Sequence, residues 1–268
     1  MTDAAGARIH LYTVSWNEEA MLEFFFRHYD PLVDRYVVYD DRSTDRTLEM
    51  LSQHPRVEIR KFERVAPDSF VKSHAVWQNN IWKESRGSAD WIILTAIDEY
   101  LYHPDLARYL SGARDAGVTA IPALGYQMVS RDFPAPDENL ALTRTRGSPD
   151  MTYSKLSLFN PDAILQTNYT LGRHFAVPTG RVKYPERDEL LILHYKYLGV
   201  EHVAQRNALL LTGFGKADHE GNAGFQYKWS KEKLIETFDF LESKSIDIRD
   251  PNAHSPEWHF WPRWWRKT

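Results

Sequence analysis

Five side chains that can bind nucleotides or metal ions lie at or just after the ends of strands that the sequence predicts. Asn17 follows the first strand, Asp40 and Asp41 follow the second, Asp98 ends the fourth, and His194 lies on a later strand. Ligands of open parallel sheets bind beyond the carboxyl ends of the strands, so we expect these side chains to gather at one rim. Carboxylate oxygens together with one imidazole form a ligand set that suits Mn²⁺ or Mg²⁺.

The elements that must position these side chains alternate between strand and helix. Runs rich in β-branched and aromatic residues predict four strands in the first hundred residues, at 8–15, 34–40, 56–62 and 90–98. Helical spacing and capping residues predict helices at 17–29, 43–51 and 71–85, with Asn17 as the N-cap of the first. This alternation favours a parallel sheet with right-handed crossovers.

The second half of the chain follows a different pattern. After a helix that ends near residue 116, strands are predicted at 118–130, 153–160 and 188–198, and long proline-containing loops separate them. Long loops in a compact domain usually serve a function.

The composition limits the classes of partner and of compartment. The 268 residues carry a formal net charge of -4 and no long basic run before the C-terminus, which argues against a nucleic-acid partner. The lack of cysteine excludes disulfides, thiolate metal sites and a cysteine nucleophile. The first ten residues lack the features of a signal peptide, and the longest apolar runs are far too short to span a membrane. We therefore expect a cytoplasmic protein.

Four motifs, in this order along the chain, resemble family 2 of the GT-A glycosyltransferases: TVSWNEE at 13–19, YVVYDDRSTDRT at 36–47, ADWIILTAIDEYLY at 89–102 and LHYKYLG at 193–199. They look most like the branch with an Asp-Glu-aromatic acidic motif and a later His-Tyr strand. The resemblance implies an α/β fold of the GT-A type, with a Rossmann-like, mostly parallel central sheet flanked by helices and a loop-rich second half. It implies a single domain over 1–268, with a nucleotide-sugar-binding half at 8–125, an acceptor-facing half at 126–245 and a Trp/basic tail at 246–268.

The same resemblance implies an activity and its partners. Such an enzyme transfers a sugar from a nucleoside-diphosphate sugar, a UDP-sugar being favoured, to a hydroxyl of a glycan or lipid-linked acceptor. The transfer is metal-assisted and inverting, and it serves glycan or polysaccharide biosynthesis. Asp40 or Asp41 would accept from the base or ribose with Asn17 nearby, and Lys155 would meet the diphosphate. The alternatives are a turn for the two aspartates and a solvated surface position for the lysine.

The resemblance also assigns metal binding to Asp98 and His194. The first acid of the family's Asp-x-Asp motif is replaced by Ala96, so one contact to Mn²⁺ or Mg²⁺ is missing and the metal affinity is in question. His194 can instead be a hydrogen-bonded core residue. The catalytic base has no recognisable motif, and its candidates are His174 and Asp188 or Glu189. A structural role is the alternative for each of them.

Two further segments are candidates for contact with substrates. The glycine-bearing segment 213–227 is predicted either to fold over the donor or to form a surface loop. The tail from 257 to 268 combines four Trp with basic residues, which suits peripheral contact with the inner face of a membrane. Docking of this tail on the core or on a second subunit is the alternative.

Two other functions remain open. A sugar-nucleotide nucleotidyltransferase shares the α/β layout and the metal carboxylates, but it needs a glycine-rich, basic loop after the first strand, where this chain has SWNEEA. A non-catalytic carbohydrate-binding protein with the same fold is favoured by the missing acid at Ala96. Hydrolysis or transfer of a labelled donor distinguishes the enzyme from the binding protein.

Overall fold

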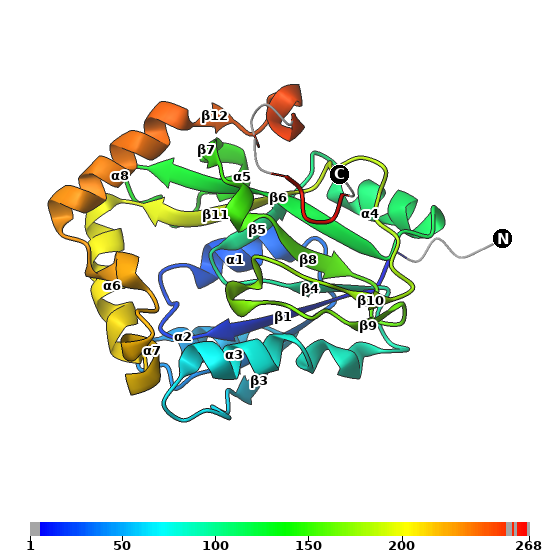
Figure 1. Ribbon diagram of the computed structural model, residues 1–268, viewed down its shortest axis with the longest axis horizontal. Coiled ribbons are helices and arrows are strands. Elements are labelled where there is room, and N and C mark those ends of the chain that lie inside the picture. Colours follow the sequence, from blue (N-terminus) through cyan, green and yellow to red (C-terminus); the bar gives the residue numbers. More distant parts are fainter. Residues whose placement is uncertain (1–5, 256–258, 260–261, 267–268) are drawn as a thin grey trace.

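The centre of the protein is one ten-stranded sheet (Figure 1). The computed structural model describes residues 6–255, 259 and 262–266. The strands of the large sheet are β1 (Ile9–Ser15), β2 (Arg35–Asp40), β3 (Val57–Lys61), β4 (Trp91–Leu94), β5 (Glu99–Tyr102), β6 (Ala120–Ser130), β7 (Arg146–Pro149), β8 (Lys155–Phe159), β11 (Leu191–Leu198) and β12 (Ile246–Asp247). A small second sheet consists of β9 (Ile164–Gln166) and β10 (Thr179–Gly180).

The helices connect and cover these strands. The α-helices are α1 (Leu22–Tyr29), α2 (Thr47–Gln53), α3 (Phe70–Gln78), α4 (Leu106–Asp115), α5 (Leu140–Thr143), α6 (Val200–Gly213), α7 (Lys216–Glu220) and α8 (Lys231–Lys244). The short 3₁₀ helices are η1 (Ile81–Ser85), η2 (Met151–Tyr153), η3 (Leu171–Arg173), η4 (Phe225–Lys228) and η5 (Pro251–His254).

The direction of the strands gives the sheet one edge at which several carboxyl ends meet. Strands β3, β2, β1 and β4 are neighbours and are all parallel. Strand β8 runs antiparallel between β4 and β6, and β11 is parallel to β6. The predicted fold class, α/β with a mostly parallel central sheet flanked by helices, is confirmed.

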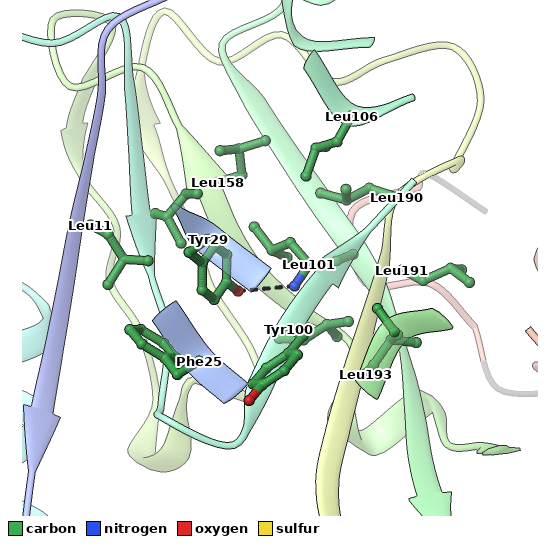
Figure 2. Close-up of a cluster of buried hydrophobic side chains, with 14 of the residues drawn as sticks. Leu11, Phe25, Tyr29, Tyr100, Leu101, Leu106, Leu158, Leu190, Leu191 and Leu193 are labelled. Carbon is green, nitrogen blue, oxygen red and sulfur yellow. Dashed lines mark hydrogen bonds between the residues drawn. The ribbon is translucent and has the colours of Figure 1, made fainter. Parts of the chain in front are cut away.

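Helix α1 packs against the sheet through a largely aromatic face. Phe25 and Tyr29 are fully buried in the same cluster as Leu11 of β1 (Figure 2). The Tyr29 hydroxyl accepts a hydrogen bond from the Leu101 amide and donates one to the Glu99 carbonyl, both at 2.9 Å. A buried hydroxyl without partners would be costly, so these two bonds hold β5 in place beside α1. They thereby fix the turn that precedes β5.

Strand β1 is covered on both faces, as a parallel strand of an α/β sheet should be. Leu11 belongs to the cluster that contains α1, whereas Tyr12 belongs to a second cluster with Trp82 of η1. The Tyr12 hydroxyl lies 2.6 Å from Ser85 Oγ, so its polar end is satisfied as well. The alternation along β1 therefore anchors the strand from two sides.

Three local predictions differ from the structure. Asn17 is not a helix cap, because α1 begins at Leu22 and Asn17 has a left-handed backbone with φ 53°. The predicted helix at 71–85 is divided into α3 and η1. Strand β4 ends at Leu94, so Asp98 lies in the turn between β4 and β5 rather than on the strand.

A group of helices for which the sequence patterns gave no prediction lies beyond the carboxyl edge of the sheet. Helices α6, α7 and α8 occupy the left side of Figure 1, where β1 ends. Arg206 of α6 donates to the carbonyls of Trp16 and Asn17, at 3.2 and 2.7 Å. The second half of the chain therefore closes over the end of the first strand.

The described part of the C-terminal tail packs on the body of the protein. Trp265 is 6% exposed, and its indole N–H donates to Asp188 at 2.8 Å. Two of the four tail tryptophans, Trp258 and Trp261, lie outside the described residues, as do Glu257, Phe260, Lys267 and Thr268. Where the structure describes the tail, it docks on the core, which was one of the two alternatives. None of the described helices is both long enough and apolar enough to cross a membrane.

Candidate functional site

A cavity of about 330 Å³ lies at the carboxyl edge of the sheet. Among the ionisable residues that line it are Asp98, Lys155, His174, His194 and Lys196. We call this the central cavity. Four of these five residues were predicted from the sequence, and Lys196 was not.

The centre of this cavity is a contact between Asp98 and His194. Nε2 of His194 lies 3.2 Å from Oδ2 of Asp98. On the other side of the ring, Nδ1 lies 2.8 Å from Oε1 of Gln127, an acceptor, so Nδ1 donates to Gln127 and Nε2 faces Asp98. Burial acts to raise the pKa of Asp98, but the adjacent His194 outweighs it and the pKa is lowered from its ordinary value.

This pair fits one side of a divalent-cation site. A metal-binding histidine commonly donates its other ring N–H to a fixed acceptor, as His194 does to Gln127. Ala96 also lines the cavity, at the position where the sequence resemblance predicts a second carboxylate. Among residues 6–255, 259 and 262–266 no group of three or more His, Cys, Asp or Glu side chains could hold a metal ion. The residues present fit a cation that completes its coordination with substrate oxygens and water, as Mg²⁺ commonly does.

Glu99 and Lys155 form a buried ion cluster in the wall of the central cavity. Lys155 Nζ contacts Glu99 Oε1, and Arg173 donates to Glu99 Oε2 at 2.5 Å. Burial would raise the pKa of Glu99, but Lys155 and Arg173 hold it well below its ordinary value. The charge of Lys155 is therefore largely neutralised by Glu99, and the solvated position that was its alternative is wrong because the residue is 5% exposed.

Lys196 lines the central cavity and has no ion-pair partner among the described carboxylates. Its Nζ lies 4.7 Å from the centre of the Tyr227 ring and 5.5 Å from that of Tyr197, and no ion pair within 4.0 Å joins it to any described carboxylate. Burial lowers the pKa of Lys196 to about 8, an effect that Asp98 opposes. The position of Lys196 in the cavity could have been predicted, because residues two apart on a strand share a face and His194 is two residues away.

Asn17 and Asp40 organise the loops at the end of β1 and β2. The side-chain oxygen of Asn17 accepts from the amides of Thr44 and Asp45, at 2.7 and 3.3 Å. Asp40 accepts from the Ser43 amide at 3.0 Å and is 6% exposed. For Asp40 this is the turn role that was one of its alternatives. Neither residue lines the central cavity.

Asp41 lies in a narrow slot of about 90 Å³ beside the central cavity. We call this the side slot. Arg64 contacts Asp41 at 2.5 Å, and the rings of Trp16 and Phe70 line the same slot. Glu18 and two other residues line both the side slot and the central cavity, so the two spaces adjoin.

Glu18 was expected at the rim of the sheet because it follows the first strand, but no role in the site was predicted for it. It contacts Arg206 of α6 and lines the central cavity, within electrostatic reach of Asp98. Burial raises the pKa of Glu18 to about 7, Arg206 opposes that rise and Asp98 adds to it. Glu18 is the first acid of SWNEE, directly after β1, and this position indicated that it could face the site. Its partner Arg206 could not be predicted, because it lies almost two hundred residues away in the sequence.

His174 is held at the mouth of the central cavity in one tautomer. Its Nδ1 lies 2.6 Å from the carbonyl oxygen of Thr152, which can only accept, so Nδ1 is protonated. Nε2 is then a free acceptor, and the residue lines both the central cavity and a neighbouring space. His174 therefore has the geometry of a proton acceptor.

Asp188, a second candidate base, is not in this site, and we withdraw it. Its carboxylate contacts Arg263 at 2.6 Å and Arg266 at 2.5 Å, and it accepts from Trp265 at 2.8 Å. The side chain is 2% exposed. A carboxylate enclosed by two guanidinium groups and an indole anchors the tail and has no access to a substrate.

The glycine-bearing segment 213–227 is folded over the edge of the sheet by one buried carboxylate. Asp218 of α7 accepts from Ser69 Oγ at 2.5 Å, from the Phe70 amide at 2.7 Å and from the Gly215 amide at 3.1 Å. Tyr227, at the end of the segment, lines the central cavity. The segment is thus a short helical cover rather than an irregular surface loop.

We expect Asp218→Ala to loosen this cover. The change leaves the Phe70 and Gly215 amides without their acceptor, so the free energy of unfolding should fall by about 1–3 kcal/mol. Urea denaturation measures that loss, and limited proteolysis should show new cleavage between residues 213 and 228. Asp137→Ala, at an exposed position, is the control and should change neither. Equal stability and cleavage in both variants would contradict the role of Asp218.

Comparison with known proteins gives distant structural likenesses. No protein-family model matches the chain, and no curated protein matches its sequence. S. aureus TarS 1-349 in complex with UDP-GlcNAc is similar over 96% of this chain and 78% of that one, with 10% identity and a TM-score of 0.41. The same protein in complex with UDP matches over 57% of this chain and 47% of that one, with 14% identity and a TM-score of 0.37.

A second protein among the similar structures is glucosyl-3-phosphoglycerate synthase from Mycobacterium tuberculosis, in complex with Mn²⁺, UDP and glucosyl-3-phosphoglycerate. The match covers 46% of this chain and 44% of the synthase chain, with 22% identity and a TM-score of 0.29. In this match and in that to TarS with UDP, the chain spans about half of the matched protein. At these identities and TM-scores the function must be argued from the site.

Proposed function

We propose that this protein is a metal-assisted glycosyltransferase that moves a sugar from a nucleoside-diphosphate sugar to an acceptor hydroxyl. One observation carries the proposal. The contact between Asp98 and His194, which fits a divalent cation, lies in the same cavity as Lys196, which has no carboxylate within 4.0 Å among the described residues. A cation site beside a free ammonium group suits a diphosphate, whose charge grows as the sugar leaves.

The donor would span two adjoining spaces. Its diphosphate would lie in the central cavity, next to Lys196 and to the cation that Asp98 and His194 would hold. Its base would enter the side slot, where the rings of Trp16 and Phe70 offer flat apolar surfaces. Asp41 would accept a hydrogen bond from the base once Arg64 shifts away. When bound, the cation would stabilise the negative charge of the leaving diphosphate.

His174 would act as the base that takes the proton from the acceptor hydroxyl. The acceptor oxygen would form a bond to the anomeric carbon while the bond from that carbon to the diphosphate oxygen breaks, and the electron pair leaves with the diphosphate. The acceptor proton would pass to Nε2 of His174, which the bond from Nδ1 to Thr152 leaves unprotonated. Attack from the face opposite the leaving group would invert the configuration.

Nucleotide titration tests the donor half of this proposal. We expect UDP to bind more tightly than GDP or CMP, and more tightly with Mn²⁺ present than without it. Isothermal titration calorimetry with each nucleotide, in Mn²⁺ and in EDTA, measures both differences. If no nucleotide binds in either condition, the proposal fails.

A non-catalytic carbohydrate-binding protein is the second candidate, because Ala96 stands where a metal-binding acid is expected. The two candidates differ in one measurement. A transferase slowly hydrolyses its labelled donor even without an acceptor, whereas a binding protein leaves the donor intact.

A further inference from the structure

A second and larger space, of about 820 Å³, opens beside the central cavity. Four residues line both spaces: Tyr153, His174, Lys196 and Gln226. We call the second space the aromatic trough. Because His174 lies where the two spaces meet, a molecule in the trough can present a group to Nε2 of His174.

The outer wall of the trough consists of aromatic side chains that face solvent. Phe225 of η4 is 56% exposed and Phe240 of α8 is 60% exposed. Trp229 lies between these two elements, with its ring 6.0 Å from that of Phe225 in an edge-to-face arrangement. Large apolar side chains that gather on an exposed concave surface usually mark a binding site.

Polar groups are interleaved with these rings. Gln226, Glu236 and Thr237 line the trough with amide, carboxylate and hydroxyl groups, and Asp150 adds a second carboxylate. Sugars present both kinds of surface, since a ring has a face of C–H groups that packs on an aromatic ring and a rim of hydroxyls that needs hydrogen-bond partners. The two carboxylates of the trough are balanced by Lys196 and Lys233, and Lys233 pairs with Glu236, so the trough has no excess positive charge to attract the headgroup of an anionic lipid.

The geometry points to the aromatic trough as the binding site of a carbohydrate acceptor, with one sugar ring on Trp229 or Phe240 and the reactive hydroxyl directed at His174. This inference rests on the proposed glycosyltransferase function and narrows its acceptor to a glycan. It also assigns a binding role to η4 and α8, which lie far from the donor motifs in the sequence.

Two variants test it, Trp229→Ala and Phe240→Ala. Ile235→Ala is the control, because Ile235 lies on the same helix as Phe240 and does not line the trough. We expect the wild type and the control to be retained on an array of defined oligosaccharides. Each aromatic variant should lose about tenfold or more in affinity for the retained glycan. With that glycan as acceptor, the KM for transfer should rise by the same factor. UDP affinity and the hydrolysis of labelled UDP-sugar to water should stay unchanged, which also shows that the variants are folded.

The outcomes separate the two proposals. If the wild type neither binds nucleotide nor hydrolyses donor, the transferase function fails, while loss of glycan retention in the aromatic variants would still support a carbohydrate site in the trough. If the donor binds and is hydrolysed but no oligosaccharide is retained, the trough does not bind glycans. If Trp229→Ala, Phe240→Ala and the control retain the same amount of glycan, the inference is wrong. It is also wrong if the wild type binds vesicles of acidic lipid but no oligosaccharide.

Discussion

Asp98→Asn is expected to abolish the Mn²⁺ dependence of UDP binding and to reduce sugar transfer by about a hundredfold or more. The change keeps the size of the side chain but removes the charge that would hold the cation beside His194. A metal that stabilises the leaving diphosphate supplies several kcal/mol, and each 1.36 kcal/mol corresponds to about tenfold in rate. Calorimetry with and without Mn²⁺ measures the first effect, and initial rates of transfer measure the second.

Asp132→Asn is the control for this change, since Asp132 is an exposed aspartate that does not line the central cavity. It should bind UDP and Mn²⁺ as the wild type does. If Asp98→Asn binds UDP with the same Mn²⁺ enhancement as the wild type, the cation site is elsewhere. Circular dichroism and thermal unfolding must show that both variants are folded.

The elements around the site could be predicted from the sequence because each depends on local pattern. The predicted strands are short apolar runs bounded by turn residues, and the structure has β1, β2, β4, β6, β8 and β11 at these places. The expectation that Asp98 and His194 meet also followed from pattern, because both lie at one edge of the sheet. In the structure the two side chains are in contact at 3.2 Å.

The roles of individual side chains could not be predicted in the same way, because a role depends on distant partners. Asp188 looked like a free carboxylate before a strand, but its partners Arg263 and Arg266 lie some 75 residues further along the chain. Lys155 looked like a cation for the diphosphate, but Glu99 neutralises it from another strand. No local spacing contains either of these contacts.

The aspartates of the DDRSTD motif show the same limit at shorter range. Asp40 and Asp41 are adjacent, yet one accepts from the Ser43 amide within its own turn and the other faces Arg64 in the side slot. Successive side chains at the end of a strand point in opposite directions, so only one of a pair can face a ligand. The sequence predicts that one of the two aspartates faces a ligand, and the three-dimensional structure is needed to decide which one.

If the proposed function holds, the missing acid at Ala96 would give Lys196 a larger role in donor binding than it would have beside a metal site with two carboxylates. With only Asp98 and His194 available, a cation would be held more weakly, so at a given Mn²⁺ concentration a larger share of the bound diphosphate would lack its metal and would depend on Lys196. A site of this kind should depend on its protein cation as well as on Mn²⁺.

Lys196→Met is therefore expected to weaken UDP binding about tenfold to hundredfold, the range for loss of one charge-assisted hydrogen bond. Lys196→Arg keeps a positive charge and should recover a large part of the affinity, because the diphosphate needs charge more than a particular geometry here. Lys233→Met is the matched control, since Lys233 lies on the far wall of the aromatic trough and is already paired with Glu236 at 3.0 Å. Calorimetry with UDP in Mn²⁺ measures all three Kd values. Equal losses in Lys196→Met and Lys196→Arg would mean that the position is sensitive to packing rather than to charge, and the diphosphate would then have to lie elsewhere in the cavity.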